Sequence, residues 1–386
     1  MSSTVVLPRV LIVAGTRPEC LKLASLVRAL RSRNDVESVL LNSGQHSAMV
    51  EQTFAHLDLV CDLNGAQIAP MSLSHALTQL RQQIREAAIA QRVNLLVAQG
   101  DTSTAYATSL AARDLGLPLA HVEAGLRTAH PYRPFPEELF RRRIAPIAAL
   151  HFAPTATAVD NLRNEGIAAQ RIHQVGNPIV DLLRDQVEDT RPLALPFLPD
   201  TQEIVALTLH RRENYGRGLD VVCAAVLDLL ARRPDCGVVC PVHPNPIVGA
   251  RIRRHLSRHP RVVLVPPLDY RPFIALLAHA RLAITDSGGI QEEAPYLGTP
   301  VLVVRENTER PESVAIGAAT LVPLKPERIL AEALRLLDAP HPPHLPFAAD
   351  SPYGDGQSGQ RIAGIIARAD VTAAPCRATA LSSSSA

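Results

Sequence analysis

Short apolar runs of strand length alternate with helical stripes of leucine and valine, and this series occurs twice along the chain. In the first series the apolar runs lie at residues 10–13, 95–98 and 119–122. The spacing of leucine and valine over 23–30 predicts a helix after the first run. Near-continuous apolar strands that alternate with helices are typical of parallel sheets covered by helices on both faces. The pattern therefore predicts an α/β fold.

A turn-rich stretch punctuated by proline, near 178–202, separates the two series. The second series has predicted strands at 204–209, 237–240, 262–265, 282–285 and 301–304. Helical spacing of leucine and valine marks 219–230 and 330–337. The second series therefore predicts another parallel sheet with its own helices.

Two such series joined by a linker predict two Rossmann-like domains that face each other across a cleft. The length of 386 residues agrees with two domains. We expect the first domain at 1–180 and the second at 181–368, with the last helix crossing back to the first domain. Residues 369–386 are rich in Ala, Ser and Thr and are expected to form a disordered tail.

The charge balance argues against a nucleic-acid partner. Lys and Arg total 39 against 37 Asp and Glu, a formal net charge of +2. A nucleic-acid face would show a clustered basic excess. The chain has no Trp, 6 Tyr and 7 Phe, so stacking platforms for single-stranded bases are not expected either.

Cysteine usage and the absence of targeting patterns favour a cytoplasmic protein. The six cysteines form no CxxC pair and are expected to be free thiols. The sequence shows neither a signal peptide nor the roughly 18 consecutive apolar residues of a membrane helix. None of the 14 His residues has a zinc-binding spacing, so no metal is expected.

Two predicted helix starts carry residues suited to phosphate. Arg17 and Lys22 follow the first strand, and Ser287-Gly288-Gly289 follow the strand at 282–285. Helix N-termini attract anions, and glycine lets the backbone approach a phosphate closely. Glu293 could accept hydrogen bonds from ribose hydroxyls. The structural alternatives are a surface Arg and Lys on an amphipathic helix and an ordinary glycine-rich turn from strand to helix. Two such helix starts, one in each predicted domain, together favour a diphosphate ligand.

Carboxylates recur where predicted strands end. Asp101 and Glu123 follow two strands, and Glu137 follows a proline-rich loop. Clustered carboxylates shift one another's pKa values and can supply both an acid and a base. The structural alternatives are an N-cap role for Asp101 and a pair between Glu123 and Arg127.

Two histidines lie after strands of the second series. His210 ends the strand at 204–209, where an imidazole could transfer a proton or contact a leaving group. His243 lies in a proline-rich segment, where a position in a turn is the simpler interpretation.

Two local patterns are not taken as sites. Residues 354–359 match GxGxxG but do not follow a strand, so they give no case for NAD. The run Arg141-Arg142-Arg143 is expected to be a helix face that pairs with Glu137 and Glu138.

Taken together, the motifs resemble those of the UDP-N-acetylglucosamine 2-epimerases, nearest to the non-hydrolysing bacterial branch. The similarity spans about 8–368. In the first half the motifs are GTRPE at 15–19 with Lys22, GQH at 44–46, GDT at 100–102, HVEAGLRT at 121–128 and PEE at 136–138. In the second half they are HRREN at 210–214, PVHPNP at 241–246, DSGGIQEEAP at 286–295, TERPE at 308–312 and PYGDGQ at 352–357.

The resemblance implies a glycosyltransferase-B-like fold with a catalytic first domain and a second domain that binds UDP. It implies a catalytic group of Asp101, Glu123, Glu137 and His210. It implies substrate contacts from Arg17, Lys22, Gln45, His243, Ser287, Gly288, Gly289, Glu293 and Arg310. A homodimer and the absence of any cofactor are implied as well.

In the mechanism that the resemblance implies, UDP leaves C1 as C2 loses its proton, which gives a glycal. UDP then re-adds after C2 is protonated on the opposite face, so that UDP-GlcNAc and UDP-ManNAc interconvert. Such chemistry needs a base, an acid on the other face and stabilisation of UDP. Which carboxylate is the base and which is the acid stays open.

Two departures from the family pattern leave alternatives open. Ala69-Pro70-Met71 stands where members activated by their own substrate carry Arg-Gln, and Phe140 stands where Asn is common. They leave open a hydrolysing enzyme that releases UDP and ManNAc, and an altered sugar, for example in secondary metabolism. Two separate alternatives are a glycosyltransferase of the same fold, against which the acidic residues of the first domain argue, and a catalytically silent UDP-sugar sensor.

Overall fold

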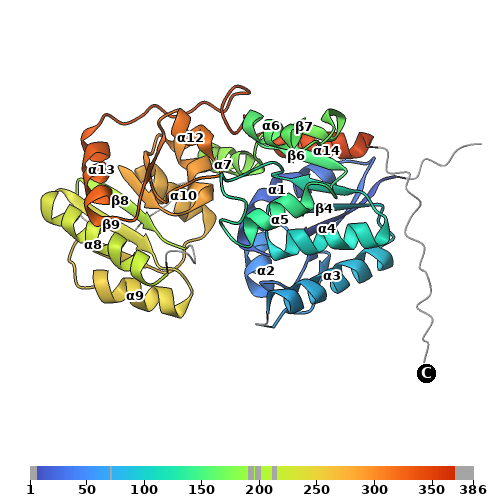
Figure 1. Cartoon of the computed structure of the whole chain (residues 1–386), viewed down its shortest axis with the longest axis horizontal. Coiled ribbons are helices and arrows are strands. Elements are labelled where there is room, and N and C mark those ends of the chain that lie inside the picture. Colours follow the sequence, from blue (N-terminus) through green and yellow to red (C-terminus); the bar gives the residue numbers. More distant parts are fainter. Residues whose placement is uncertain (1–6, 70–71, 190–194, 196–200, 211–214, 370–386) are drawn as a thin grey trace, which may run out of the picture. The chain divides into compact units, whose positions relative to one another are not determined.

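The computed structural model of the chain contains two parallel β-sheets, each covered by its own helices (Figure 1). It describes residues 7–69, 72–189, 195, 201–210 and 215–369. One unit comprises Met1–Leu182 together with Tyr353–Ala386, and the other comprises Leu183–Pro352. Almost all of the tail expected at 369–386 lies outside the described residues.

The first unit has a seven-stranded sheet in the order β3-β2-β1-β4-β5-β6-β7, and every neighbouring pair is parallel. Its strands are β1 (Arg9–Ala14), β2 (Glu37–Asn42), β3 (Leu63–Asn64), β4 (Leu95–Gln99), β5 (Leu119–Val122), β6 (Leu150–Ala153) and β7 (Ile172–Gln174). The strand order reverses between β1 and β4. Ligands of open parallel sheets bind at such a reversal, beyond the carboxyl ends of the strands.

The helices of the first unit cover both faces of this sheet. They are α1 (Arg17–Arg31), α2 (Ser47–His56), α3 (Leu73–Ala90), α4 (Ser103–Leu115), α5 (Glu137–Ile144), α6 (Ala156–Asn164) and α14 (Ser358–Arg368). Helix α7 (Pro178–Glu188) begins in the first unit and ends in the second. Leu11 and Val13 of β1 are buried in one core with residues of α3, α4 and α5. Because successive strand residues point to opposite faces, Val10 and Ile12 are buried on the other side.

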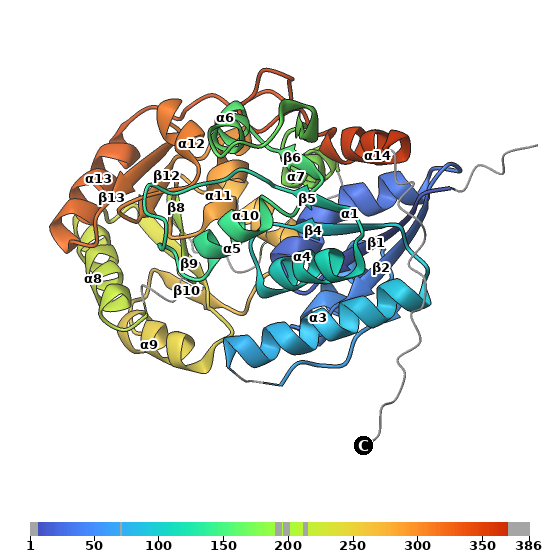
Figure 2. The ribbon, with the colours of Figure 1, turned by 45° about the vertical axis from the view of Figure 1, so that its right-hand side comes forward.

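Helix α14, from the end of the chain, lies beside α1 in Figures 1 and 2. A Cβ atom on Gly359 would come within 2.7 Å of the Ser25 carbonyl carbon, so glycine permits this close approach. The Asp181 carboxylate accepts hydrogen bonds from the backbone amides of Ser358 at 2.9 Å and Gly359 at 2.6 Å. Asp181 thereby satisfies the first free amides of α14.

The second unit has a six-stranded parallel sheet in the order β10-β9-β8-β11-β12-β13. Its strands are β8 (Glu203–Thr208), β9 (Cys236–Pro241), β10 (Val262–Val265), β11 (Leu282–Thr285), β12 (Val301–Val304) and β13 (Ala319–Val322). Its helices are α8 (Arg217–Arg232), α9 (Pro246–Leu256), α10 (Tyr270–His279), α11 (Gly288–Glu293), α12 (Pro311–Ala315) and α13 (Pro326–Asp338). The order reverses between β8 and β11.

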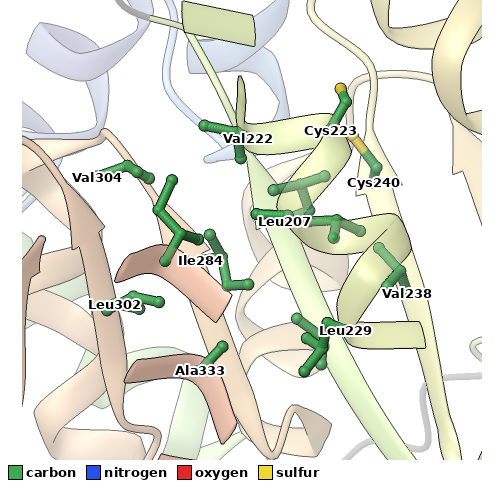
Figure 3. Close-up of a cluster of buried hydrophobic side chains, with 14 of the residues drawn as sticks. Leu207, Val222, Cys223, Leu229, Val238, Cys240, Ile284, Leu302, Val304 and Ala333 are labelled. Atoms are coloured by element: carbon green, nitrogen blue, oxygen red, sulfur yellow. The ribbon is translucent and has the colours of Figure 1, made fainter. Parts of the chain in front are cut away.

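Figure 3 shows the main core of this second sheet. Leu207, Val238 and Ile284 project from the strands toward Leu229 of α8 and Ala333 of α13. Cys223 and Cys240 lie in the same core, where burial raises the pKa of both thiols. The five cysteines in the described part of the chain are free, as expected.

The expectation of two parallel sheets covered by helices is confirmed. The proline-punctuated linker is shorter than expected, because residues from Pro178 to Glu188 form α7. Pro178 suits the first turn of a helix, and the Asn177 side chain accepts a hydrogen bond from the Ile179 amide at 3.2 Å. No described helix is both long and apolar enough to cross a membrane.

Candidate active site

Three neighbouring strands of the first unit end in the residues that the sequence singled out. Strand β1 leads to Arg17, β4 leads to Asp101 and β5 leads to Glu123. Because β4 lies between β1 and β5 and all three strands are parallel, these ends share one edge of the sheet. Arg17 is half-buried and is the first residue of α1.

Glu123 lies in a buried ion pair with Lys22. The Lys22 Nζ is 2.5 Å from the Glu123 Oε1, and the two residues are 6% and 7% exposed. Gln99, a residue that the sequence reasoning missed, donates a hydrogen bond from its Nε2 to the Glu123 Oε2. The structural alternative, a pair between Glu123 and Arg127, is wrong, because the Arg127 guanidinium pairs with Glu165 at 2.6 Å.

The backbone of Glu123 has a φ of +63°, in the left-handed region. A side chain larger than glycine is held there at a cost of roughly 1–3 kcal/mol, and such residues cluster at functional sites. Strand β5 ends at Val122, so this turn directs the Glu123 side chain away from the regular strand geometry.

Asp101 pairs with Arg141, a buried residue of α5. The Arg141 guanidinium also donates to the Glu138 Oε2 at 3.0 Å. The N-cap role considered for Asp101 is wrong, because α4 begins after Thr102, whose Oγ1 accepts from the Ala105 amide at 3.0 Å. Asp101 is thus left at the strand end with a cation beside it.

Helix α5 begins at Glu137, which is half-buried, whereas Glu138 is fully buried. The expected pairing of this acidic pair with the basic run is confirmed for Arg142 and Glu138, at 2.9 Å. The Arg141 side chain pairs with Glu138 too, and it is buried. Helix α5 thus places the buried Arg141 guanidinium beside Asp101, at the edge of the sheet.

Phe140 stands where the family commonly has Asn, and the structure places it in the core between α4 and α5. Its ring stacks on Tyr106, with 4.7 Å between the ring centroids. Aromatic stacking stabilises the contact between the two helices beyond the area that it buries. The other departure, at 69–71, lies mostly outside the described residues.

Gln45 joins the loop after β2 to the start of α4. Its Oε1 accepts hydrogen bonds from the Thr104 amide at 3.0 Å and from the Thr104 Oγ1 at 2.7 Å. Gln45, which is predicted to contact substrate, therefore has its side-chain oxygen bonded to the start of α4.

In the second unit the ends of β8 and β11 lie side by side. The Thr208 and Thr285 hydroxyls are 2.6 Å apart, and the Asp286 Oδ1 accepts from the His210 amide at 2.9 Å. The His210 imidazole is exposed, and its centroid is 6.1 Å from that of His243. Residues 211–214 of the HRREN motif lie outside the described residues.

His243 lies in the loop between β9 and α9. Its Nδ1 accepts a hydrogen bond from the Asn245 amide at 3.1 Å. Partial burial lowers the pKa of this imidazole. His210 and His243 together place two imidazoles at the carboxyl ends of β8 and β9.

Arg310 lies against the start of α11, which follows Ser287. Its Nε donates to the Glu292 Oε1 at 2.7 Å and its Nη1 donates to the Glu309 Oε1 at 2.5 Å. All three side chains are buried. The sequence reasoning missed both carboxylates, although each lies within a quoted motif.

Glu293 is 5% exposed and neighbours Tyr270, which is 7% exposed. Burial and then the Glu293 carboxylate raise the pKa of the Tyr270 hydroxyl well above its usual value, so this phenol is neutral. The Glu293 carboxylate, which is predicted to bind the ribose, is thus largely shielded from water.

Gly288→Ala is expected to destabilise the protein by about 1–3 kcal/mol, the usual cost of overpacking. The new Cβ would lie 2.5 Å from the Arg310 Nη1, and the guanidinium cannot withdraw without losing Glu292 or Glu309. Gly289→Ala is the matched control, because its Cβ would meet nothing closer than 3.8 Å. Urea unfolding measures both variants, and equal stability would contradict the expectation.

Among the residues that the structure describes, no group of three or more His, Cys, Asp or Glu side chains could hold a metal ion. The predicted residues fall into two groups, one in each unit. Arg17, Lys22, Gln45, Asp101, Glu123 and Glu137 belong to the first unit. His210, His243, Ser287, Gly288, Gly289, Glu293 and Arg310 belong to the second.

The family model described as UDP-N-acetylglucosamine 2-epimerase matches residues 28–367 of this chain. The chain belongs to the UDP-N-acetylglucosamine 2-epimerase family. It is 40% identical over 364 residues to the UDP-N-acetylglucosamine 2-epimerase of Salmonella typhimurium. The aligned residues cover 92% of this chain and 97% of that protein. The resemblance read from the motifs is therefore confirmed at the level of the family.

Solved structures of family members have the same fold. The crystal structure of UDP-GlcNAc 2-epimerase from Neisseria meningitidis bound to UDP-GlcNAc has a TM-score of 0.86 at 34% identity, and covers 93% of this chain and 99% of that chain. The enzyme from Methanocaldococcus jannaschii in complex with UDP-GlcNAc and UDP has a TM-score of 0.83 at 30% identity, with the same coverage. The wall teichoic acid polymerase TagF, at 11% identity and a TM-score of 0.50, shares the fold alone.

Proposed function

We propose that this member of the epimerase family interconverts UDP-GlcNAc and UDP-ManNAc without hydrolysing them. Family membership supports an epimerase, and two family members in the comparison bind UDP-GlcNAc. The observation that carries the proposal is the buried Glu123 carboxylate, paired with Lys22 beside the strand that leads to Asp101. This arrangement supplies carboxylates for proton transfer at one sheet edge.

The proposed reaction proceeds by elimination and re-addition. The proton on C2 of the sugar is not acidic, so its removal is coupled to cleavage of the bond between C1 and the UDP oxygen. The products of this step are a 2-acetamidoglycal and UDP. Protonation of C2 from the opposite face and re-addition of UDP to C1 then give the other isomer. No electrons are exchanged with a cofactor, and the proposal includes none.

The proposal assigns proton transfer to Asp101, Glu123 and Glu137. The first two are held in ion pairs, by Arg141 and Lys22, and an anionic carboxylate is the form that accepts a proton. The mechanism needs one group on each face of C2, which three acidic residues can supply. The assignment of base and acid among them is left to the variants discussed below.

The proposal assigns UDP binding mainly to the second unit. Ser287, Gly288 and Gly289 begin a helix, where free backbone amides favour a diphosphate. Glu293 would accept from the ribose hydroxyls, and His210 would protonate or contact the leaving UDP. Arg17, at the start of α1, would add a cation to the diphosphate.

Incubation of the enzyme with UDP-GlcNAc in D2O, followed by proton NMR, tests the proposal. We expect deuterium at C2 of both UDP-GlcNAc and UDP-ManNAc, with the UDP-sugars remaining the main products. Stoichiometric release of UDP and free ManNAc would replace the proposal by the hydrolysing reaction. No exchange at C2 would contradict an epimerase.

A cytoplasmic homodimer is also part of the proposal. Free thiols at five cysteines of the described chain support a reducing compartment. The homodimer rests on the family resemblance, and analytical ultracentrifugation would test it through the mass in solution.

A further inference from the structure

Glu19 is fully buried where the loop after β1 meets the loop after β4. Its Oε2 accepts hydrogen bonds from the Gly15 amide and the Thr16 hydroxyl, each at 2.9 Å. Its Oε1 accepts from the Thr102 hydroxyl at 2.6 Å. One carboxylate thus joins two loops that are far apart in the sequence.

The two loops carry residues with different parts in the proposed reaction. Thr16 immediately precedes Arg17, which is assigned to the diphosphate, and Thr102 immediately follows Asp101, which is assigned to proton transfer. Strands β1 and β4 are neighbours in the sheet, at the reversal of strand order. The contacts of Glu19 therefore hold together the loops that bear these two groups.

Capping of α1 does not account for all of these contacts. An acidic residue in the first turn commonly reaches back to the start of its own helix, as the Oε2 of Glu19 does. The Oε1 is directed instead to Thr102, the N-cap of α4, whose Oγ1 also accepts from the Ala105 amide at 3.0 Å. The second oxygen thus bonds to another helix, at the residue beside Asp101.

Burial raises the pKa of Glu19 to about 7, against the lowering effect of its hydrogen bonds. The groups that bond to it are the amides of Gly15 and Thr16 and the hydroxyls of Thr16 and Thr102, none of which is charged. A buried carboxyl that no cation neutralises is costly for the fold. Stability alone would favour an uncharged side chain at this position.

We propose that Glu19 is a positioning residue that sets the separation between Arg17 and Asp101, so that UDP is held correctly while C2 loses or gains its proton. This inference rests on the proposed function. It predicts that loss of the link lowers turnover much more than it lowers UDP affinity, because small displacements of a catalytic group cost about 100-fold in rate.

The test breaks the link from each side. Glu19→Met and Thr102→Val are expected to lower kcat by about 10- to 100-fold while changing the Kd for UDP by less than about threefold. Glu19→Gln and Thr102→Ser keep polar atoms in the same places and are expected to retain kcat within about fivefold. Thr155→Val is the matched control, because Thr155 caps α6 in the same way, by accepting from the Ala158 amide at 3.1 Å.

Each outcome decides one question. A fall in melting temperature for both Thr102→Val and Thr155→Val, with kcat lowered only by the former, supports the positioning role. Unchanged kcat in Glu19→Met, or equal losses of kcat in the two threonine variants, overturns it. Inactivity of the wild-type enzyme in the D2O assay would overturn the proposed function instead.

Amide hydrogen exchange tests the link without using activity. Glu19→Met is expected to speed exchange at Gly15, whose amide bonds to Glu19, and at Ala105, whose amide bonds to Thr102. Unchanged protection at either amide would show that the carboxylate does not couple the two loops, and would overturn the inference.

The raised pKa of Glu19 also predicts how stability depends on pH. Its pKa rises from 4.5 to about 7 on folding, so the unfolded chain ionises first as the pH increases. This residue therefore costs the folded state stability between about pH 4.5 and 7, and the cost persists above that range. The melting temperature of Glu19→Gln minus that of the wild type is expected to increase from pH 5 to pH 8. A constant or shrinking difference would contradict it.

Discussion

Replacing Glu123 by glutamine is expected to lower the rate of C2 deuterium exchange by about 100- to 10,000-fold, the range typical of losing a general acid or base. The amide keeps the shape of the side chain and can still accept from Lys22, but it cannot take up a proton near neutral pH. Its single oxygen can accept from either Lys22 or Gln99, which donate to the two oxygens of the carboxylate, and its amide nitrogen then faces the other donor. Loss of the buried ion pair is expected to lower stability as well. Urea unfolding therefore accompanies the rate measurement, to show that the variant is folded while proton transfer is lost.

Exchange at C2 measured by proton NMR in D2O gives the rate directly. Asp114→Asn is a suitable control, because Asp114 lies in the same unit and pairs with the partly exposed Arg81 on the neighbouring α3. Its exchange rate is expected to match that of the wild type. Retention of more than about a tenth of the wild-type rate by Glu123→Gln would place the essential carboxylate elsewhere, at Asp101 or Glu137.

Replacing Lys22 by methionine is expected to lower the free energy of unfolding by about 3–5 kcal/mol, because it leaves the Glu123 carboxylate buried without its cation. Both side chains of the pair are less than a tenth exposed, so water cannot replace the lost ammonium. The double variant Lys22→Met with Glu123→Gln removes both charges. It is expected to regain most of the lost stability while remaining inactive.

Urea unfolding of the wild type, the two single variants and the double variant gives the coupling energy between Lys22 and Glu123. Arg81→Met is the control for a pair on the surface, which is worth about 1 kcal/mol or less. A double variant as unstable as Lys22→Met alone would show that Lys22 stabilises the fold by packing rather than by its charge.

Much of the fold could be predicted because the inner strands are almost purely apolar. Strands such as β4 and β12 are buried on both faces, and burial on both faces leaves a continuous apolar run. The edge strands β3 and β7 are short and partly exposed, and they carry mixed sequences that periodicity does not detect. Helix α7 was missed because proline was read as a sign of a linker rather than of a helix start.

The candidate site was predictable as a set of positions and less so as a set of contacts. Asp101 and Glu123 were identified because polar residues directly follow apolar strands. Their cations were not, because Lys22 and Arg141 come from helices that begin after other strands or loops. Glu138 was quoted only within the acidic pair, and no local signal showed that it, rather than Glu137, is the buried member.

The sequence by itself determined the two parallel sheets, the strand ends that carry the polar residues and the family to which the chain belongs. These depend on local patterns of apolar residues and on motifs, which can be read one segment at a time. Only the tertiary structure decided which charges are paired, since strand order brings Lys22 to Glu123 and Arg141 to Asp101. Such partners are selected by burial, where an unpaired charge is costly and distance along the chain carries no information.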